Sequence, residues 1–407
     1  MSDALAFATI GELGAAIRSG SVTPTELATY FLERLDTVGR NLNAVATLTP
    51  ERALAAARKA EDELTAGVDR GPLHGIPYGA KDLLATVDYP TSWGAAPMRD
   101  QQFDRDAEVI RLLDEAGAVL CAKLSMVEIA GGFGYEQPDA AFNGPGKCAW
   151  GADSWAGGSS SGSGSAVAAG CVPFAIGTET WGSILCPSSF NGLTGLRPTY
   201  GTVSRSGAMA LAWTMDKIGP MCHTAVDCEL VLNAIAERVG WTEMERARPP
   251  FRLGVLAGSA DEAQPEVATT PAAALDALRF RSAGRGFAAG RYPWDSAASV
   301  IAMAEAASAF EEFIVSGESQ GCPRRRTAPV CITHWRCRQR TICGCCAFVG
   351  RQCACWTSSF PATMPLWHQR CRMWRFHCAT GSTPGSAKSG GRHRRGGESF
   401  AAFRPSR

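Results

Sequence analysis

The sequence of 407 residues lacks the features of a membrane-spanning protein and of a nucleotide-binding protein. It has no run of 18 or more apolar residues, so no membrane span is expected. The N-terminal segment MSDALAFATIGELG has no basic stretch followed by an apolar one, so we expect no signal peptide and predict a cytoplasmic location. No G-x-x-x-x-G-K-[ST] motif occurs, which argues against a phosphate-binding loop.

The chain also lacks an excess of charge of either sign. Lys and Arg number 40 against 39 Asp and Glu, so the whole-chain balance of +1 favours no charged partner. Hydrophobic residues make up 45% and charged residues 19%, which is ordinary for a soluble globular enzyme. The length is sufficient to bury one large core or two smaller ones.

Residues 321–407 differ in composition from everything before them. They carry fifteen arginines and one lysine against a single acid, Glu398, and four tryptophans. Ten of the sixteen cysteines lie between Cys322 and Cys378, and no stretch has a clean period of 2 or 3.6 residues. We therefore predict a domain over residues 1–320 and a Cys-, Arg- and Trp-rich tail over residues 321–407.

Three interpretations of this tail compete. Cys343-x-x-Cys346 suggests a zinc module, but no second pair has the required spacing. Mixed arginines and aromatics suggest a nucleic-acid-binding tail, for which so many thiols would be unusual. We favour a third interpretation, a shift of the coding frame near Gln320, because that would abolish the patterning and deplete acids abruptly at one point. On this interpretation the tail is poorly ordered and binds neither metal nor nucleic acid.

Helices alternate with short apolar strands over the first 240 residues, which predicts an α/β sheet covered by helices. The segment TPTE at residues 23–26 is a capping box with proline at the first helical position. A turn is expected around residues 75–79. Helices are expected at 50–66, 106–116, near 166–169, 270–279 and 294–317, and strands at 118–122, 172–176 and 251–256.

Three segments carry glycine, serine and lysine in an arrangement that suits nucleophilic catalysis. They are GIPYGAKD at residues 75–82, GGSSSGSGS at 157–165 and GTETWGSI at 177–184. Taken singly, each has a plain explanation, because a Gly/Ser run is more often a flexible linker and a lone lysine after a turn is usually solvated.

Together the three segments resemble the amidase signature family. That family has a G-[IV]-P-x-x-x-K-D segment, a G-G-S-S-G-G-S run and a G-T-[DE]-x-x-G-S-[IV] segment in the same order. Ser159 and Ser183 are 24 positions apart, which is the family's usual interval. Matching text continues through NGLTGLRPT at 191–199, GTVSR at 201–205 and DKIGPM at 216–221. The resemblance is strong over residues 8–240, weaker over 251–320 and absent from the tail.

The resemblance implies an α/β fold, a mixed β-sheet core sandwiched by helices. Because the resemblance stops at the tail, we expect the C-terminal part of this fold to be incomplete. The resemblance also implies a carboxamide hydrolase without a metal or other cofactor. Ser183 would be the nucleophile, Lys81 the general base and Ser159 the relay between them, and Ser159 would sit directly before a cis peptide bond. The oxyanion hole would be formed by the backbone N–H groups of Thr180, Trp181 and Gly182.

These roles are chemically coherent. A serine hydroxyl is a weak nucleophile that needs an adjacent base, and Ser-Lys systems are a recognised variant of the Ser-His-Asp arrangement. The lysine pKa must fall from about 10.4 towards the working pH, and burial among the apolar and glycine-rich flanks of Lys81 would lower it. Asp82 is adjacent in sequence, but consecutive side chains need not face each other. His74 near this segment is not needed for a Ser-Lys pattern.

Two positions close to Ser183 depart from the family pattern. Trp181 stands where the family usually has glycine, and Leu185 stands where it usually has arginine. The loss of the arginine weakens an assignment as the A subunit of a tRNA-dependent amidotransferase, which is the alternative enzyme. Cys186 is expected to be a small buried apolar residue.

The sequence thus predicts a small-molecule amide as the substrate and leaves open whether the chain forms a homodimer. An alternative from another class is a catalytically inactive product. If the tail is out of frame, core strands are missing and sheet edges and apolar faces are left uncovered.

Overall fold

The structure is a computed structural model that describes residues 3–131, 139–140, 143–236, 263–277 and 294–322. The strand expected at 251–256 and residues 323–407 lie outside this described part, so the proposed division of the chain at residue 320 stays a prediction. The chain divides into two units, Met1–Glu237 with Ser299–Arg407, and Arg238–Ala298. The three motif segments all lie in the first unit.

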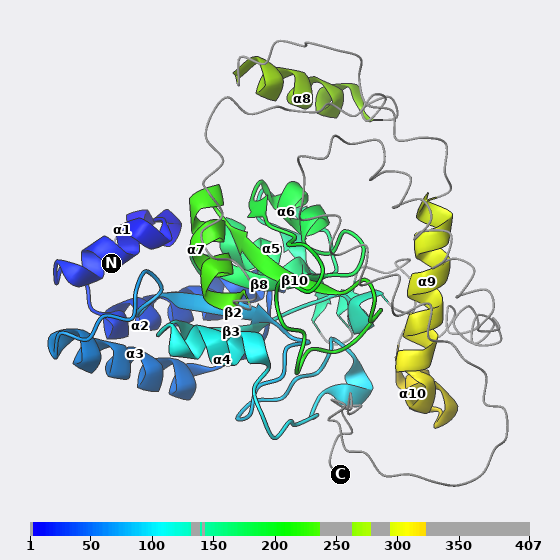
Figure 1. The fold of residues 1–407 in the computed structure, drawn as a ribbon, viewed down its shortest axis with the longest axis horizontal. Helices are drawn as coiled ribbons and strands as arrows, with labels where there is room; N and C mark the ends of the chain where they lie inside the picture. The colour runs from blue at the N-terminus through cyan, green and yellow to red at the C-terminus, as the bar shows by residue number, and fades with distance from the viewer. Residues whose placement is uncertain (1–2, 132–138, 141–142, 237–262, 278–293, 323–407) are drawn as a thin grey trace, which may run out of the picture. The chain divides into compact units, whose positions relative to one another are not determined.

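A six-stranded mixed sheet forms the centre of the first unit and confirms the predicted fold class (Figure 1). Its strand order is β1-β3-β2-β8-β10-β9. The central strands β3, β2 and β8 are parallel, whereas β1, β10 and β9 pair antiparallel with their neighbours. The strands are β1 (Val45–Leu48), β2 (Pro77–Lys81), β3 (Val119–Leu124), β8 (Phe174–Glu179), β9 (Thr194–Gly195) and β10 (Lys217–Cys222). Two small two-stranded sheets pair β4 (Asp139–Ala140) with β5 (Gly144–Pro145) and β6 (Lys147–Cys148) with β7 (Gly151–Trp155).

Helices flank this sheet and the loops that leave it. They are α1 (Ile10–Arg18), α2 (Pro24–Arg34), α3 (Pro50–Thr65), α4 (Glu108–Glu115), α5 (Ser161–Ala168), α6 (Leu185–Asn191) and α7 (Ala225–Ile235). Later in the chain follow α9 (Trp294–Ala309), whose residues 294–298 belong to the second unit, and α10 (Glu311–Val315). The second unit contains α8 (Pro265–Ala277). None of the helices within the described ranges is long and apolar enough to cross a bilayer.

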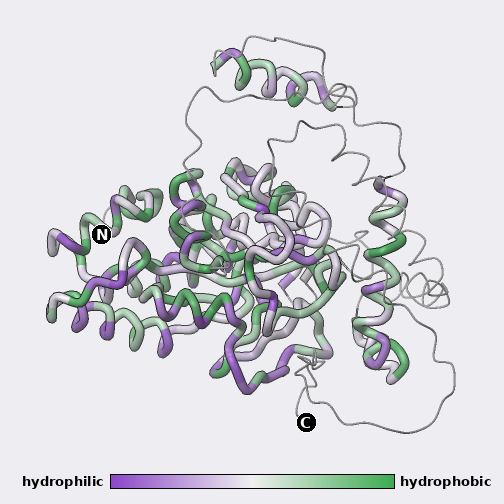
Figure 2. The backbone as a smooth tube through the Cα atoms, in the orientation of Figure 1, coloured by the Kyte–Doolittle hydropathy of each residue, from purple (hydrophilic) through white to green (hydrophobic). Residues whose placement is uncertain are grey.

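Two separate cores lie on the two faces of the sheet, because side chains alternate between its faces. In β8, Phe174 and Ile176 join a core shared with α1, α4 and α7, whereas Ala175 joins a core shared with α3 and α5. Helix α2 contributes to both. Figure 2 shows polar and apolar residues interspersed along α3, whose buried side chains are Ala53, Ala57 and Ala60. The sheet is thus covered by helices on both faces.

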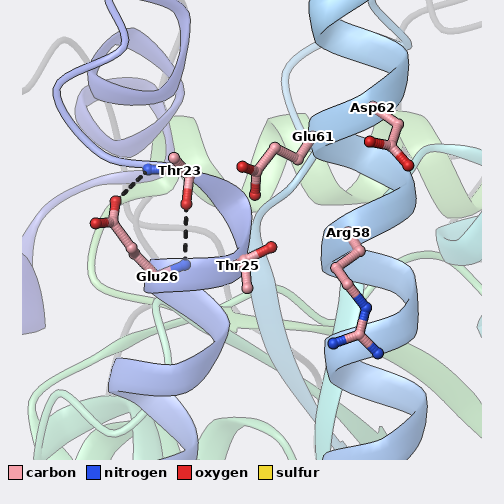
Figure 3. A pocket seen from close by; sticks show the side chains of 6 residues that line it. All are labelled: Thr23, Thr25, Glu26, Arg58, Glu61 and Asp62. Carbon is pink, nitrogen blue, oxygen red and sulfur yellow. Dashed lines mark hydrogen bonds between the residues drawn. The ribbon is translucent and has the colours of Figure 1, made fainter.

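The capping box predicted for residues 23–26 is confirmed at the start of α2 (Figure 3). The Thr23 hydroxyl accepts a hydrogen bond from Glu26 N at 3.1 Å, and the Glu26 carboxylate accepts one from Thr23 N at 2.8 Å. Pro24 occupies the first helical position. A cap of this kind contributes about 1 kcal/mol to helix stability. The capping box fixes the start of α2, which packs against β2 and β3.

Two helices differ from the sequence expectation. Helix α5 begins at Ser161, inside the Gly/Ser stretch, rather than near residue 166. Glycine and serine are weak helix formers, but here tertiary packing decides, because a Cβ on Gly162 would lie 2.4 Å from Ala44 O. The helix expected over 294–317 is divided into α9 and α10 at Phe310, whose φ and ψ are −106° and 18°.

The segment around residues 75–79 also differs, since strand β2 already runs through Pro77–Lys81 where a turn was expected. A Cβ on Gly79 would lie 2.4 Å from Leu124 Cδ1, so glycine permits close contact between β2 and β3. Lys81 therefore ends a central strand instead of following a turn.

The close approach at Gly162 yields a test of the packing of α5. Gly162→Ala places a methyl group within 2.7 Å of three backbone atoms, so we expect a loss of about 1–3 kcal/mol or more in the free energy of unfolding. Gly11→Ala in α1 is the matched control, because its Cβ meets no atom closer than 4.0 Å and alanine is the better helix former. Urea denaturation of both variants measures the difference, and equal stabilities would contradict this packing.

Candidate active site

Lys81 lies at the carboxyl end of β2, fully buried within the first unit. Its Nζ is 2.6 Å from Ser159 Oγ, 3.0 Å from Thr178 Oγ1 and 3.5 Å from Thr178 O. The parallel pairing of Ala80 with Ile176 brings the ends of β2 and β8 to the same edge of the sheet. The structure thus joins Lys81 to a serine 78 positions away in sequence.

Ser159 lies in the loop before α5 and is also buried. Its carbonyl accepts a hydrogen bond from Val127 N at 3.0 Å. The peptide bond between Gly158 and Ser159 is cis, so the cis bond precedes Ser159 and the expectation that it follows this serine was wrong by one position. Gly157 has a φ of +77°, and a Cβ there would lie 2.9 Å from Pro187 Cα. Only glycine combines that backbone angle with such a close neighbour.

Ser183 lies in the turn between β8 and α6 and is nearly buried. Ser160 N donates to Ser183 O at 3.3 Å, so Ser183 is hydrogen-bonded to the residue that directly follows Ser159. Gly182 has a φ of +95°, which favours glycine at this position of the turn. Lys81, Ser159 and Ser183, three residues from separate segments, are therefore gathered at one end of β2 and β8.

Glu179 anchors this turn from the end of β8. Its buried carboxylate accepts hydrogen bonds from Ile184 N at 2.9 Å and Leu185 N at 3.0 Å, the two residues directly after Ser183. These N–H groups start α6, and a carboxylate at a helix N-terminus is favoured by the helix dipole. The sequence reasoning gave Glu179 no role, although it stands at the acidic position of the G-T-[DE] motif.

A second carboxylate anchors the same turn from the strand β10 side. Asp216 Oδ1 accepts from Thr180 Oγ1 at 2.6 Å, and its Oδ2 accepts from Leu211 N and Ala212 N. Lys217 Nζ donates to Thr180 O at 2.9 Å. The motif at residues 216–221 was recognised in the sequence, but nothing in it indicated that Asp216 and Lys217 hold Thr180.

Burial sets the protonation of Lys81. The loss of solvent around its Nζ lowers its pKa from 10.5 to about 7, while the negative charges of Asp216 and Glu179 oppose the shift. A lysine with this pKa is substantially neutral at neutral pH, and the neutral amine can accept a proton. Asp82, the next residue, forms an ion pair with Lys123 instead, with Nζ and Oδ1 3.1 Å apart.

The remaining candidates lie as follows. His74 is held in a structural cluster, where its Nδ1 accepts from Arg70 N and its Nε2 is 3.1 Å from Glu63 Oε2. Cys186 is half-buried, so the expectation of a fully buried thiol was wrong. It lies on the first turn of α6, which sits at the surface.

The two departures from the family pattern flank Ser183. Trp181 is 52% exposed and Leu185 is 47% exposed. Thr180, Trp181 and Gly182 follow β8 directly and lead into Ser183, so their backbone N–H groups belong to the same turn as its hydroxyl. Within the described residues, no group of three or more His, Cys, Asp or Glu side chains is placed to hold a metal ion.

Comparison with known proteins agrees with this geometry. The sequence matches the Amidase family over residues 26–280. It is 41% identical over 249 residues to the A subunit of glutamyl-tRNA(Gln) amidotransferase from Methylococcus capsulatus, covering 61% of this chain and 50% of that protein. The peptide amidase of Stenotrophomonas maltophilia has a similar structure, with a TM-score of 0.72 and 26% identity over 85% of this chain and 79% of that one. An amidase family protein from Bacillus anthracis gives a TM-score of 0.73 and 25% identity over 86% of this chain and 77% of that one.

This chain therefore belongs to the amidase family, whose members are hydrolases of amide C–N bonds. The resemblance found in the sequence motifs is confirmed by the match over residues 26–280. The chain spans about half the length of the curated relatives it matches.

The anchoring of the turn by Glu179 can be tested by stability. Glu179→Ala leaves the N–H groups of Ile184 and Leu185 without their acceptor. The Ile184 donor is buried and costs about 1–3 kcal/mol when unpaired, whereas Leu185 is half-exposed, so that water can replace its acceptor. We expect a loss of this size in the free energy of unfolding by urea denaturation. Glu33→Ala, at an exposed position of α2, is the control and should stay within about 0.5 kcal/mol of the parent chain. A Glu179→Ala variant as stable as this control would show that the turn does not depend on the carboxylate.

Proposed function

We propose that this protein hydrolyses the C–N bond of a small carboxamide through an acyl-enzyme on Ser183. The observation that carries the proposal is the 2.6 Å contact between the buried Lys81 Nζ and Ser159 Oγ. Ser183 lies close by, because its carbonyl accepts a hydrogen bond from the backbone N–H of Ser160, the residue after Ser159. A buried amine in contact with a hydroxyl is the arrangement that a Ser-Lys nucleophile system requires. The membership in the amidase family supports the same reaction class.

In the acylation step, Ser183 Oγ attacks the carbonyl carbon of the amide. Its proton passes to Ser159 Oγ while the Ser159 proton passes to Lys81 Nζ, so Ser159 is unchanged and Lys81 becomes an ammonium. The buried Lys81, with a pKa of about 7, is suited to this role, because a base works best when its pKa lies near the working pH. Collapse of the tetrahedral intermediate breaks the C–N bond, and the departing amine takes the proton back from Lys81 through Ser159.

Backbone N–H groups of Thr180, Trp181 and Gly182 are proposed to stabilise the oxyanion of that intermediate. The turn is held by Glu179 on one side and by Asp216 and Lys217 on the other, so its donors are positioned before the reaction begins. One such donor typically contributes about 2.7–4 kcal/mol to the transition state. Because the donors belong to the backbone, the tryptophan side chain at position 181 leaves them in place.

Deacylation repeats the proton transfers with water as the nucleophile. Water attacks the Ser183 ester, its proton passes through Ser159 to Lys81, and Ser183 Oγ leaves with the proton returned by the same route. The products are a carboxylic acid and ammonia or an amine. Each step uses only groups of the chain, the substrate and water.

Replacement of the nucleophile gives a direct test. Ser183→Ala removes the attacking oxygen and should lower kcat by roughly 10⁴–10⁶-fold, as for other serine nucleophiles. Ser188→Ala on α6 is the control, since that serine is also buried nearby but has no proposed part in the reaction. Amide turnover by the purified 407-residue chain is the measurement. Turnover that survives Ser183→Ala would refute the assignment, and a parent chain without turnover would favour the inactive alternative.

The pKa of Lys81 predicts the pH dependence. The base must be neutral, so kcat/KM should fall about tenfold per pH unit as the pH drops below about 7. Above that pH it should reach a plateau until another group titrates. A pH–rate profile over roughly pH 5–9 measures this. A Lys81→Arg variant should lose activity across this range, because a guanidinium stays protonated. An acid limb centred near 4 would instead indicate a carboxylate base.

A second candidate function is that of a glutamyl-tRNA(Gln) amidotransferase A subunit. It is favoured by the 41% identity to proteins of that name. Against it stands Leu185, a half-exposed apolar residue where the family usually carries arginine. Copurification with partner subunits and a glutaminase assay with and without them separate the two functions. Amide hydrolysis by the isolated chain favours the amidase, whereas glutamine hydrolysis only with partners favours the amidotransferase.

A further inference from the structure

A second fully buried lysine, Lys123, lies on the strand beside Lys81. In the parallel pairing of β2 with β3, Lys123 is opposite Ala80 and Leu124 is opposite Lys81. Ala80 belongs to the core shared with α1, α4 and α7, whereas Leu124 belongs to the core on the other face. Because paired residues share a face, Lys123 and Lys81 project to opposite faces of the sheet.

Lys123 is surrounded by four oxygen atoms from four residues. Its Nζ is 3.1 Å from Asp82 Oδ1 and 2.6 Å from Thr91 Oγ1, and longer contacts reach Thr86 Oγ1 at 3.3 Å and Pro90 O at 3.4 Å. A lysine ammonium has three donors and no acceptor, which fits this set. Burial lowers the pKa of Lys123, but the Asp82 carboxylate opposes that shift. Lys81, by contrast, contacts two hydroxyls and a carbonyl and no carboxylate.

Asp82, directly after Lys81, is held by hydrogen bonds at Oδ2 and at both backbone polar atoms, and by an ion pair at Oδ1. Its Oδ2 accepts from Ser92 N at 3.1 Å and from Ser92 Oγ, and its Oδ1 faces Lys123. Its backbone N donates to Leu124 O at 2.9 Å, and its carbonyl accepts from Trp93 N at 3.0 Å. The carboxylate is therefore committed to the Lys123 side of the sheet.

The pairing of Asp82 with Lys123 matters because Asp82 is the residue next to the proposed base Lys81. An opposite charge within about 4–6 Å favours the charged form of a lysine and can raise its pKa by 1–3 units. A carboxylate next in sequence to the base would hold Lys81 as an ammonium if it turned towards it. The other charged side chains on the elements around Lys81 are Glu179, Asp216, Lys217 and Glu128. Glu179 and Asp216 already accept hydrogen bonds from the Ser183 turn and the 211–212 loop.

We propose that Lys123 is a positioning residue for the reaction, which neutralises Asp82 and holds it on the face of the sheet opposite Lys81, so that the base has no carboxylate partner. This inference rests on the proposed role of Lys81 as the general base. Lys123 touches neither substrate nor the reacting atoms. Its effect acts through the protonation of Lys81.

The role of Lys123 can be tested by measuring the pH midpoint at which Lys81 loses its proton, which requires no substrate turnover. The full chain is labelled with ¹³C at the lysine ε-carbons, and the Lys81 signal is assigned by its loss in Lys81→Met. Lys123→Met should raise the midpoint of Lys81 by about one pH unit or more, because Asp82 loses its partner. The double variant Asp82→Asn/Lys123→Met should return the midpoint to within a few tenths of a unit of the parent value. Lys59→Met, at an exposed position of α3, is the control and should leave it unchanged.

A second variant decides the matter if Lys123→Met does not fold. Asp82→Asn keeps the size of the side chain and leaves Lys123 without its counter-ion, so it should move the Lys81 midpoint in the opposite direction, to lower pH. An unmoved midpoint in a folded Lys123→Met or Asp82→Asn chain overturns the proposal. If activity is measured, the acid limb of the kcat/KM pH profile should move together with the titration midpoint of Lys81. A lower kcat with an unmoved acid limb would mean that Lys123 has only a structural role.

Failure of this inference is distinguishable from failure of the proposed function. A parent chain that hydrolyses no amide would count against the enzymatic role, while the titration of Lys81 would still show whether Lys123 controls its protonation. Conversely, an active chain whose Lys81 midpoint ignores Lys123 would retain the function and lose this inference.

Discussion

The burial of the Lys81 amine against Ser159 is the constraint on which the rest of the site depends. A lysine in water is charged at neutral pH and cannot accept a proton, whereas full burial lowers its pKa to about 7. Burial needs a closed environment, and the parallel strands β2, β3 and β8 supply it with helices on both faces of the sheet. The close packing at Gly79 and Gly162 completes this enclosure, because any side chain there would separate the layers.

Three carboxylates near the site are engaged by other groups. Glu179 and Asp216 hold the turn that carries Ser183, and Asp82 pairs with Lys123 on the opposite face of the sheet. Each carboxylate thus has a structural task that keeps it from pairing directly with Lys81. The hydrogen bonds of Glu179 and Asp216 therefore fix the turn that carries Ser183, the proposed nucleophile, while both charges still oppose the lowered pKa of Lys81, the proposed base.

Much of this could be predicted from the sequence, since local signals specify it. The TPTE capping box starts α2, and the motif segments containing Lys81, Ser159 and Ser183 identify the family. What could not be predicted depends on tertiary contact. Helix α5 begins within a Gly/Ser stretch because Gly162 packs on the backbone of Ala44 and Ser125, which no helix propensity reveals. The pairing of Asp82 with Lys123 links residues 41 positions apart by sequence numbers and requires the β2–β3 register.

The central claim is that Ser183 forms a covalent acyl intermediate with the help of Lys81. The most direct measurement is mass spectrometry of the chain quenched in acid during turnover of an amide, followed by peptide mapping. We expect an added acyl mass on the peptide that contains Ser183 and none in a Lys81→Met variant. An acyl group on a different residue would contradict a covalent intermediate on Ser183. So would turnover in which the enzyme–substrate complex accumulates but no covalent adduct is found.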